Sequence, residues 1–328
     1  MEIIENPVAE TSAPLTPARY DISFHGKGGE YFGVIIVNWL LSIVTLGLYY
    51  PWAKARQLQY LYAATELNTS RFSFHGTGKE MFKGFIKAIF IFAVLLAMFF
   101  TLVVMKHPVA AFICLYGGIF AIIPLAIHGS YKYRLSRTSW RSIRFGYRGD
   151  RTELYKLFFK NIFFTIITFG IYGAWMAINI RKYLMNNVRF GNLKFNYEGD
   201  GGEYFVLNLK GYFLTIFTIG IYMFWWQASL LKYYIDNLSL NDEKGNKITM
   251  KSIATGGDFF GLIIVNLFII IFTFGLGYAW VVTRTLKFMF SKCELTGSIE
   301  LLELVQSEKS YVDATGEDLS DMLDLGIV

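Results

Sequence analysis

The chain has 328 residues, of which 54% are apolar and 17% are charged. Soluble domains usually contain about a quarter of charged residues, so this composition, with a mean hydropathy of +0.40, indicates a membrane protein rather than two soluble domains. The net charge is +6, but the basic residues are scattered beside apolar stretches, which argues against nucleic-acid binding. The two cysteines, Cys114 and Cys293, have the spacing of neither a metal site nor a disulfide framework.

The first predicted elements are a short strand and two helices. Residues 20–25 alternate between apolar and polar side chains, as a strand does, and glycines separate them from an apolar stretch at 31–47. As a helix this stretch is roughly 25 Å long, against about 30 Å for the hydrocarbon core of a bilayer, so a simple crossing is marginal. A Thr-Leu-Gly turn ends the stretch, and Pro51 suits the first turn of a second helix.

This helix–turn–helix pattern occurs four times without a gap. Each copy opens with an acid, followed by a threonine 15, a glycine 17, a tryptophan 22 and an aromatic residue 30 positions later. The copies span residues 28–67, 150–188, 200–238 and 256–292. Such a match indicates a repeated structural unit made of an apolar helix, a Thr-x-Gly turn and an amphipathic helix.

The segment between the first and second copies contains two longer apolar stretches. Residues 71–82 repeat the opening motif of residues 21–32, and the stretches at 83–105 and 109–128 predict two plain transmembrane helices. The loop that follows carries seven basic residues from Lys132 to Arg151, which places it in the cytoplasm.

Together these elements predict an all-α polytopic membrane protein with short β-strands in the cytoplasmic links. We divide the chain into a disordered segment 1–19, a membrane domain 20–300 and an acidic tail 301–328. Basic residues flank both ends of the units, so we expect shallow hairpins that enter and leave on the cytoplasmic side and turn at Thr-x-Gly, with the tryptophan at headgroup level. A broken helix that exposes its backbone to an ion or solute is the alternative.

The acids that open the helices have the spacing of helix caps. A threonine or aspartate stands three residues before most of them, as in a capping box, although Lys27 occupies this place before the first acid. We therefore expect capping rather than catalysis or ion binding. The predicted cap acids are Glu30, Glu80, Glu153, Glu203 and Asp258.

The second helix of each unit carries a polar stripe. Its positions are 26, 29 and 33 residues after the acid and lie on one helical face. The candidate functional cations on these stripes are Arg56, Lys182, Lys232 and Arg284. One interpretation places them in the interface beside lipid headgroups, and the other makes them face a shared polar cavity. The snorkelling of Lys and Arg is common, so the first is favoured.

Catalytic and metal-binding patterns are absent from the sequence. His25 and His75 occupy matching Ser-Phe-His-Gly positions, where a solvent-facing strand position is a simpler interpretation than a metal or pH-sensitive pair. No nucleophile–base pair or acid pair stands out, so we expect neither an enzyme nor a cofactor or metal.

The run TLGLYYPWAKARQLQYLY, with FHGKGGEYF and FHGTGKEMF, resembles the YjgN family of bacterial inner-membrane proteins, a domain of unknown function. The resemblance covers about residues 20–300 and is strongest in the first unit. It implies a multi-pass protein of the bacterial inner membrane, but it carries over no activity or catalytic residue.

Two functions remain open at this point. The first is a transporter or channel for a small anionic solute, because repeated units and four cationic stripes could form one path. The second is a non-transporting scaffold or lipid-interacting protein whose cations bind anionic headgroups. The expected partners are therefore membrane lipids and, for a transporter, a small solute; the sequence sets no oligomeric state.

Overall fold

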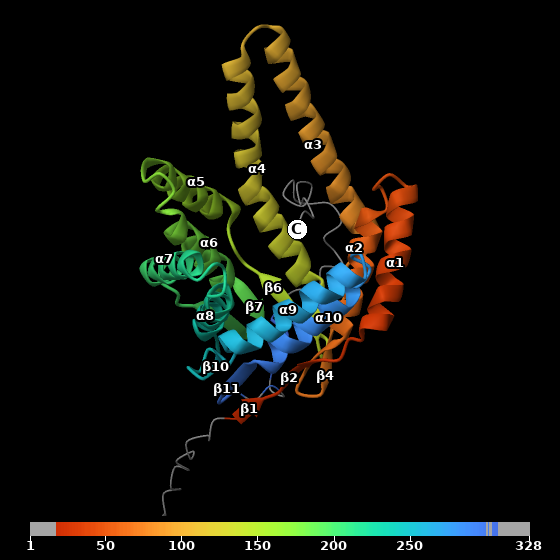
Figure 1. The fold of residues 1–328 in the computed structure, drawn as a ribbon, viewed down its shortest axis with the longest axis vertical. Helices are drawn as coiled ribbons and strands as arrows, with labels where there is room; N and C mark the ends of the chain where they lie inside the picture. Colours follow the sequence, from red (N-terminus) through yellow and green to blue (C-terminus); the bar gives the residue numbers. More distant parts are fainter. Residues whose placement is uncertain (1–17, 300, 302–303, 308–328) are drawn as a thin grey trace, which may run out of the picture.

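The computed structural model describes residues 18–299, 301 and 304–307 (Figure 1). Most of the predicted disordered segment 1–19 and acidic tail 301–328 therefore lies outside the described residues. Helical hairpins alternate along the chain with pairs of strands. The ten helices are α1 Gly28–Val44, α2 Tyr50–Ala63, α3 Gly78–Val104, α4 Pro108–Ser136, α5 Arg151–Ile167, α6 Gly173–Asn186, α7 Gly201–Phe217, α8 Met223–Asp236, α9 Gly256–Phe272 and α10 Tyr278–Ser291.

The strands of the described part form one antiparallel sheet. They are β1 Ala18–Tyr20, β2 Ile22–Phe24, β3 Thr65–Leu67, β4 Ser70–Phe74, β5 Thr138–Trp140, β6 Ile143–Tyr147, β7 Val188–Phe190, β8 Leu193–Tyr197, β9 Leu238–Asn241, β10 Lys247–Ser252 and β11 Cys293–Gly297. Their order is β1-β11-β10-β9-β8-β7-β6-β5-β4-β3-β2. Only Asp21 separates the two edge strands in sequence, so the sheet curls into a nearly closed barrel.

The interior of this barrel is the main apolar core. Buried side chains from strands on opposite sides meet there, and the chain after β11 adds three more. Trp140 is fully buried at its centre and donates through Nε1 to the carbonyl oxygens of Leu67 and Ser70 at 3.2 and 2.9 Å. The core comprises Tyr20, Leu67, Trp140, Phe190, Leu193, Leu240, Ile248, Leu295, Ile299, Leu301 and Leu304.

The barrel corrects the predicted fold class. The chain is not an all-α protein with isolated strands in its links, because every link contributes strands to one continuous sheet. The local sequence indicates some of the strands, such as the one expected at residues 20–25. Their partners lie tens of residues away, however, as in the pairing of Phe74 with Thr138 or of Tyr20 with Leu295. Local periodicity carries no information about such pairings.

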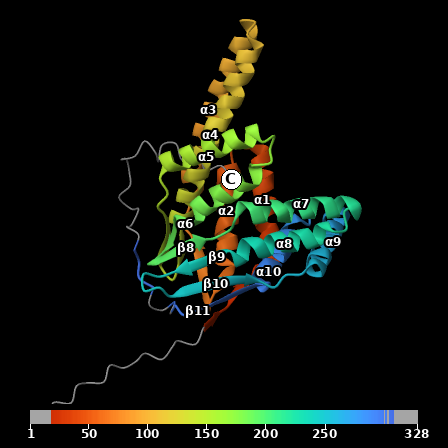
Figure 2. The ribbon, with the colours of Figure 1, turned by 90° about the vertical axis from the view of Figure 1, so that its left-hand side faces the viewer.

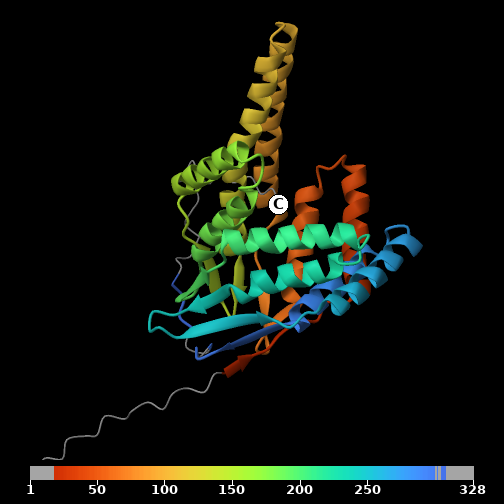
Figure 3. The same cartoon turned by 60° about the vertical axis from the view of Figure 1, so that its left-hand side comes forward.

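The helical hairpins form a closed ring at one end of the barrel. Each helix contacts the next one in the chain, and α10 contacts α1. The second helices also pack on strands: α2 on β4, α4 on β6, α6 on β8, α8 on β10 and α10 on β2. Figure 3 shows the strands at one end and the hairpins extending away from them, and in Figure 2 α3 and α4 project beyond the others.

Four of the hairpins share one turn geometry at the Thr-x-Gly motif. In the first, Leu46 and Gly47 have positive φ angles of 50° and 88°, and the other three repeat these values within a few degrees. The Thr45 hydroxyl donates to the Leu41 carbonyl at 2.7 Å and accepts from the Tyr49 amide at 3.0 Å. The glycine therefore supplies the left-handed backbone, and the threonine satisfies backbone groups at the tip.

The helices α3 and α4 form a fifth, elongated hairpin. The sequence predicts them as two plain transmembrane helices, and they are the two in the described part that are long and apolar enough to cross a bilayer. They have 27 and 29 residues, against 14 to 17 in the other hairpins. Their most apolar windows are 0% and 11% buried, unlike the core helices of soluble proteins. Lys106, with φ 62°, and Pro108 replace the Thr-x-Gly turn.

The tryptophan has the same position in all four repeated units, and the packing of the helices explains why. Each of these rings covers the first glycine of the following helix, so closely that a Cβ on that glycine would lie 2.3–2.4 Å from a ring carbon. The pairs are Trp52 on Gly78, Trp175 on Gly201, Trp225 on Gly256 and Trp280 on Gly28. The last pair joins the final hairpin to the first. These tryptophans therefore lock neighbouring hairpins together, and their place at headgroup level stays a prediction.

One junction between hairpins lacks this contact, and both of its partners are changed. The position in α4 that corresponds to the tryptophan is Leu125, and the first residue of α5 is Arg151 instead of glycine. In the first helices of the five hairpins, the first residue is thus glycine only where a tryptophan ring covers it.

We expect Gly78→Ala and Gly201→Ala to destabilise the protein. Each new methyl group would overlap a tryptophan ring and approach the backbone Cα of that tryptophan within 3 Å. Overpacking of this kind costs about 1–3 kcal/mol. Thermal unfolding in detergent measures the effect. Gly29→Ala is the matched control, because nothing lies within 4 Å of its Cβ position; an equal loss of stability in all three variants would contradict the locking role.

Candidate functional site

The predicted cap acids lie at the bases of the hairpins, where the first helices begin. Thr77 and Glu80 form a capping box: the Glu80 amide donates to the Thr77 hydroxyl at 3.3 Å, and the Thr77 amide donates to the Glu80 carboxylate at 3.2 Å. Thr255 and Asp258 form a second one. These acids satisfy amides at the helix starts, which the first turn of a helix leaves unpaired.

The remaining three acids are held differently. Asp150 and Asp200 are the N-caps of α5 and α7, and their side chains accept from the amides of Glu153 and Glu203 at 2.8 and 3.0 Å. Glu30 forms an ion pair with Lys27 at 3.1 Å. The ion pair and the hydrogen bond with Lys27 lower the pKa of Glu30.

In three of the four repeated units, the tyrosine 30 positions after the acid closes the hairpin at its base. The Tyr183 and Tyr233 hydroxyls donate to the N-cap carbonyls of Asp150 and Asp200 at 2.6 and 2.5 Å. Tyr60 makes the same contact with Lys27, and Tyr133 of the elongated hairpin donates to Glu80 at 3.1 Å. These contacts hold the two helices of a hairpin together where they leave the sheet.

The fourth repeated unit uses an ion pair instead of the tyrosine. Phe288 occupies the tyrosine position, and Lys292 lies 2.9 Å from Asp258. The hydrogen bonds from Lys292 and Thr255 lower the pKa of Asp258 to about 2. All five hairpins thus have a polar contact at the base.

The four predicted cations lie on four different helices. Arg56, Lys182, Lys232 and Arg284 are exposed residues of α2, α6, α8 and α10. Arg56 lines a groove of about 430 Å³ on the outside of the first hairpin, together with Glu30 and Gln59. Their roles remain a prediction, but the structure does not bring them together around one cavity.

The opposite face of the second helices points toward the axis of the ring, where alternate helices approach one another. Lys54 of α2 lies close enough to Arg134 of α4 to feel its charge, and Tyr131 of α4 lies near both Arg134 and Arg181 of α6. On a helix, Lys54 and Arg56 lie about 160° apart around the axis. The inward cations Lys54, Arg134 and Arg181 are therefore different from the four cations on the predicted polar stripes.

Arg181 is the centre of an inward-facing aromatic cluster. Its guanidinium lies 4.3 Å from the ring centre of Tyr234 and 5.1 Å from that of Tyr197, within the range of cation–π contacts. The Tyr234 hydroxyl donates to that of Tyr204 at 2.7 Å. The sequence contains a signal for this residue: the equivalent positions of the other three copies carry leucine, namely Leu58, Leu231 and Leu286.

The tips of the hairpins are apolar and almost fully exposed. The middle residue of each Thr-x-Gly turn is 94–98% exposed, and at the tip of the elongated hairpin Val104 and Val109 are 81% and 71% exposed. The four turn residues are Leu46, Phe169, Ile219 and Phe274. Exposed apolar surface repeated at five tips is typical of contact with a membrane.

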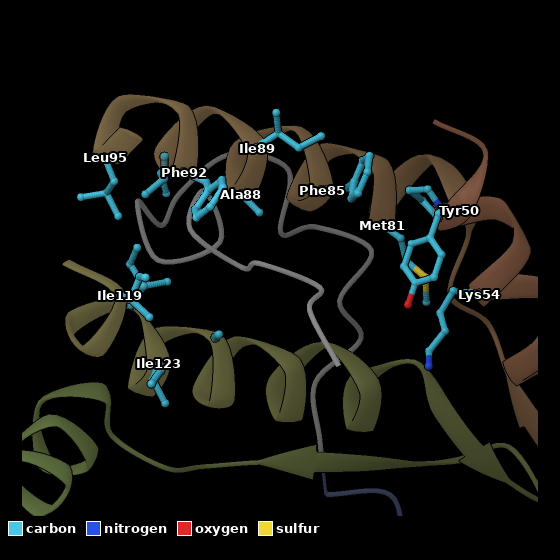
Figure 4. A pocket seen from close by; sticks show the side chains of 14 residues that line it. Tyr50, Lys54, Met81, Phe85, Ala88, Ile89, Phe92, Leu95, Ile119 and Ile123 are labelled. Carbon is cyan, nitrogen blue, oxygen red and sulfur yellow. The ribbon is translucent and has the colours of Figure 1, made fainter. Parts of the chain in front are cut away.

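An apolar pocket of about 590 Å³ lies between α2, α3 and α4. Figure 4 shows Lys54 and Tyr50 of α2 at one end and Leu95 and Ile119 at the other. Lys54 is the one charged residue of the lining. Burial lowers the pKa of Lys54, and the positive charge of Arg134 lowers it further.

The described residues contain no group of three His, Cys, Asp or Glu side chains that could hold a metal ion. His25 and His75 do not form a pair. His25 contacts Ser23 at 3.0 Å, and His75 contacts Ser139 of the neighbouring strand at 2.8 Å. That the protein is not an enzyme stays a prediction.

Comparisons with known proteins identify a family. The sequence model of a family described as bacterial proteins of unknown function, DUF898, matches residues 19–198, 192–245 and 226–322. The chain is 34% identical over 130 residues to inner membrane protein YjgN of Salmonella typhimurium, covering 40% of this chain and 32% of that protein. It is 32% identical over 141 residues to the protein of the same name from Escherichia coli O157:H7, covering 43% and 34%.

The matched stretch is thus about a third of the length of these curated relatives. No solved structure matches the chain.

The ion pair of the fourth unit should give a pH-dependent contribution to stability. The pKa of Asp258 is lowered in the folded protein, so the contribution is present above its ordinary pKa of 3.8 and is lost as the pH falls toward about 2. We expect the parent to have a higher Tm than Lys292→Met at about pH 6 and the difference to vanish near about pH 2.

Thermal unfolding of both proteins across this pH range measures the difference. Lys287→Met, a change at an exposed position on the same helix, is the control and should leave the Tm unchanged throughout. A Tm difference between the parent and Lys292→Met that is independent of pH would contradict the role of the ion pair.

Proposed function

The chain belongs to the DUF898 family of bacterial proteins, its curated relatives are inner membrane proteins, and we propose on this premise that it is a non-transporting protein that binds the anionic cytoplasmic leaflet. In this proposal α3 and α4 cross the bilayer as a pair, so the protein is multi-pass. The four short hairpins bring their apolar tips to the cytoplasmic leaflet; α1 and α2 run along the direction of α3 and α4, whereas α7 and α8 run across it (Figure 3). The barrel and the bases of the hairpins remain in the cytoplasm.

The position of the outward cations relative to the apolar tips carries the proposal. Arg56 and Arg284 follow their turn glycines by nine residues, and Lys182 and Lys232 follow theirs by twelve. At 1.5 Å per residue these positions are roughly 14–18 Å from the tips, close to the thickness of hydrocarbon in one leaflet, about 15 Å. In a hairpin that runs along the direction of α3 and α4, as the first one does in Figure 3, the cation therefore reaches the headgroup region when the tip is buried in the leaflet.

The dimensions of the helices support the same arrangement. The first helices of the short hairpins have 17 residues, or about 25 Å, and their cap acids and base contacts are polar. Such a hairpin fits one leaflet with its base outside the hydrocarbon. Helix α3, at roughly 40 Å, is long enough to cross both leaflets. The cytoplasmic orientation follows from the basic residues between Lys132 and Arg151.

The barrel supports binding rather than transport. A solute that moved along the axis of the ring would meet the apolar core around Trp140, which fills the barrel with buried side chains. The predicted cavity cations also lie on the outward faces of separate hairpins. The transport hypothesis thus lacks both the path and the convergence of charge that motivated it.

Replacing all four outward cations by glutamine should weaken the preference for anionic lipid. Each cation at the headgroup level contributes about 1 kcal/mol, or about a fivefold change, so the losses should add. Protein reconstituted in bilayers with brominated phosphatidylglycerol or brominated phosphatidylcholine allows the preference to be measured by quenching of tryptophan fluorescence. Lys232→Gln alone should leave insertion and Tm nearly unchanged.

A charge-preserving quadruple variant, in which each Arg becomes Lys and each Lys becomes Arg at these positions, is the control and should keep the preference. An unchanged preference in the glutamine variant would contradict the proposal. So would a flux of chloride or phosphate through liposomes that the parent protein supports and Lys232→Gln abolishes, because that result favours a transport path.

A further inference from the structure

The pocket between α2, α3 and α4 has the composition of a site for an amphiphile. Its lining comes from three helices and is apolar except at the end where Lys54 and the Tyr50 hydroxyl lie (Figure 4). Its volume of about 590 Å³ lies within the usual range for small-molecule sites, roughly 300–1,000 Å³. A ligand that fits this lining has one charged end and a long apolar remainder.

The charge at the polar end selects an anion. Lys54 is partly buried, and the charge that acts on it most strongly belongs to Arg134, another cation. Among the described residues, no carboxylate forms an ion pair with Lys54. A charged ammonium group in a partly buried place is costly without a counter-charge, and the headgroup of an acidic lipid supplies one. The apolar walls alone cannot supply specificity, because bilayer hydrocarbon solvates an acyl chain equally well.

The length and direction of the pocket match one lipid leaflet. The lining on α3 runs from Met81 to Leu95, which is roughly 21 Å along the helix, against about 15 Å of hydrocarbon in one leaflet. Lys54 lies near Met81, close to the start of α3 (Figure 4), and is two residues from Arg56 at the proposed headgroup level. A lipid in the leaflet would therefore have its headgroup at the basic end and its chain along the apolar walls.

We propose that this pocket binds one acidic phospholipid of the membrane, with an acyl chain between α3 and α4 and the headgroup beside Lys54. This inference rests on the proposed insertion of α3 and α4 into the bilayer. It goes beyond the proposed function because it assigns a single inward site, separate from the outward cations that contact the leaflet in general.

Photolabelling of the full chain in nanodiscs tests the site. The probe is phosphatidylglycerol with a diazirine at the middle of one acyl chain, compared with phosphatidylcholine that carries the same group. We expect mass spectrometry to find phosphatidylglycerol adducts on the inward lining residues Phe85, Leu95, Ile119 and Ile122, in excess over phosphatidylcholine adducts.

Two pairs of variants separate the charge from the shape of the pocket. Lys54→Met should lower labelling of the lining by phosphatidylglycerol about fivefold, the effect of one headgroup contact, whereas Lys83→Met on the exposed face of α3 should not change it. Ala88→Trp fills the pocket and should abolish labelling there, whereas Ala93→Trp, at an exposed position of α3 outside the lining, should leave it intact.

Three results would overturn the site. The first is equal labelling of the lining by the two lipids, and the second is labelling confined to outward residues such as Phe90 and Phe100. The third is occupation by residues 308–328 of the chain, seen as carbodiimide cross-links from their carboxylates to Lys54 in place of lipid adducts. The outward glutamine variant distinguishes the two proposals: loss of its general lipid preference with intact pocket labelling supports both, and intact preference with lost labelling in Lys54→Met supports the pocket alone.

Discussion

The contact between a tryptophan ring and the first glycine of the next helix joins the helical hairpins at four of the five junctions of the ring. At these junctions it fixes how closely the second helix approaches the following first helix, since a single methyl group would not fit between Trp175 and Gly201. The contact between Trp280 and Gly28 closes the ring. Because each hairpin is tied at its base, the outward and inward faces of the second helices are defined. The surface proposed to meet lipid and the pocket beside Lys54 both depend on this orientation.

The ring and the barrel solve different problems for a protein at a membrane surface. The barrel pairs the strands of every link and leaves almost no open edge, which avoids association through unpaired backbone groups. The hairpin tips have to be apolar and still satisfy their backbone, and the hydroxyl of Thr45 and its equivalents does so without a polar surface. The polar groups are thereby concentrated at the bases, and the apolar groups at the tips.

The sequence predicts the local features well and the long-range ones poorly. The units, their turns and the cap positions follow from spacings within about 30 residues, so they can be found without a structure. The sheet cannot, because the pairing of Tyr20 with Leu295 joins distant segments. The elongated hairpin is missed as a member of the ring because its turn lacks Thr-x-Gly. Arg181 is missed because it lies outside the predicted polar stripes. This arginine stands on the inward face, where the other three units have a leucine.

The separation of β1 from β11 along the chain has a consequence for biosynthesis. Each hairpin and its strands are local, so they can form one after another as the ribosome releases them. The pairing of β1 with β11, like the contact of Trp280 with Gly28, has to wait until the distant partner segment has been made. Until then β1 has an unpaired edge, so the sheet is completed only when β1 joins β11.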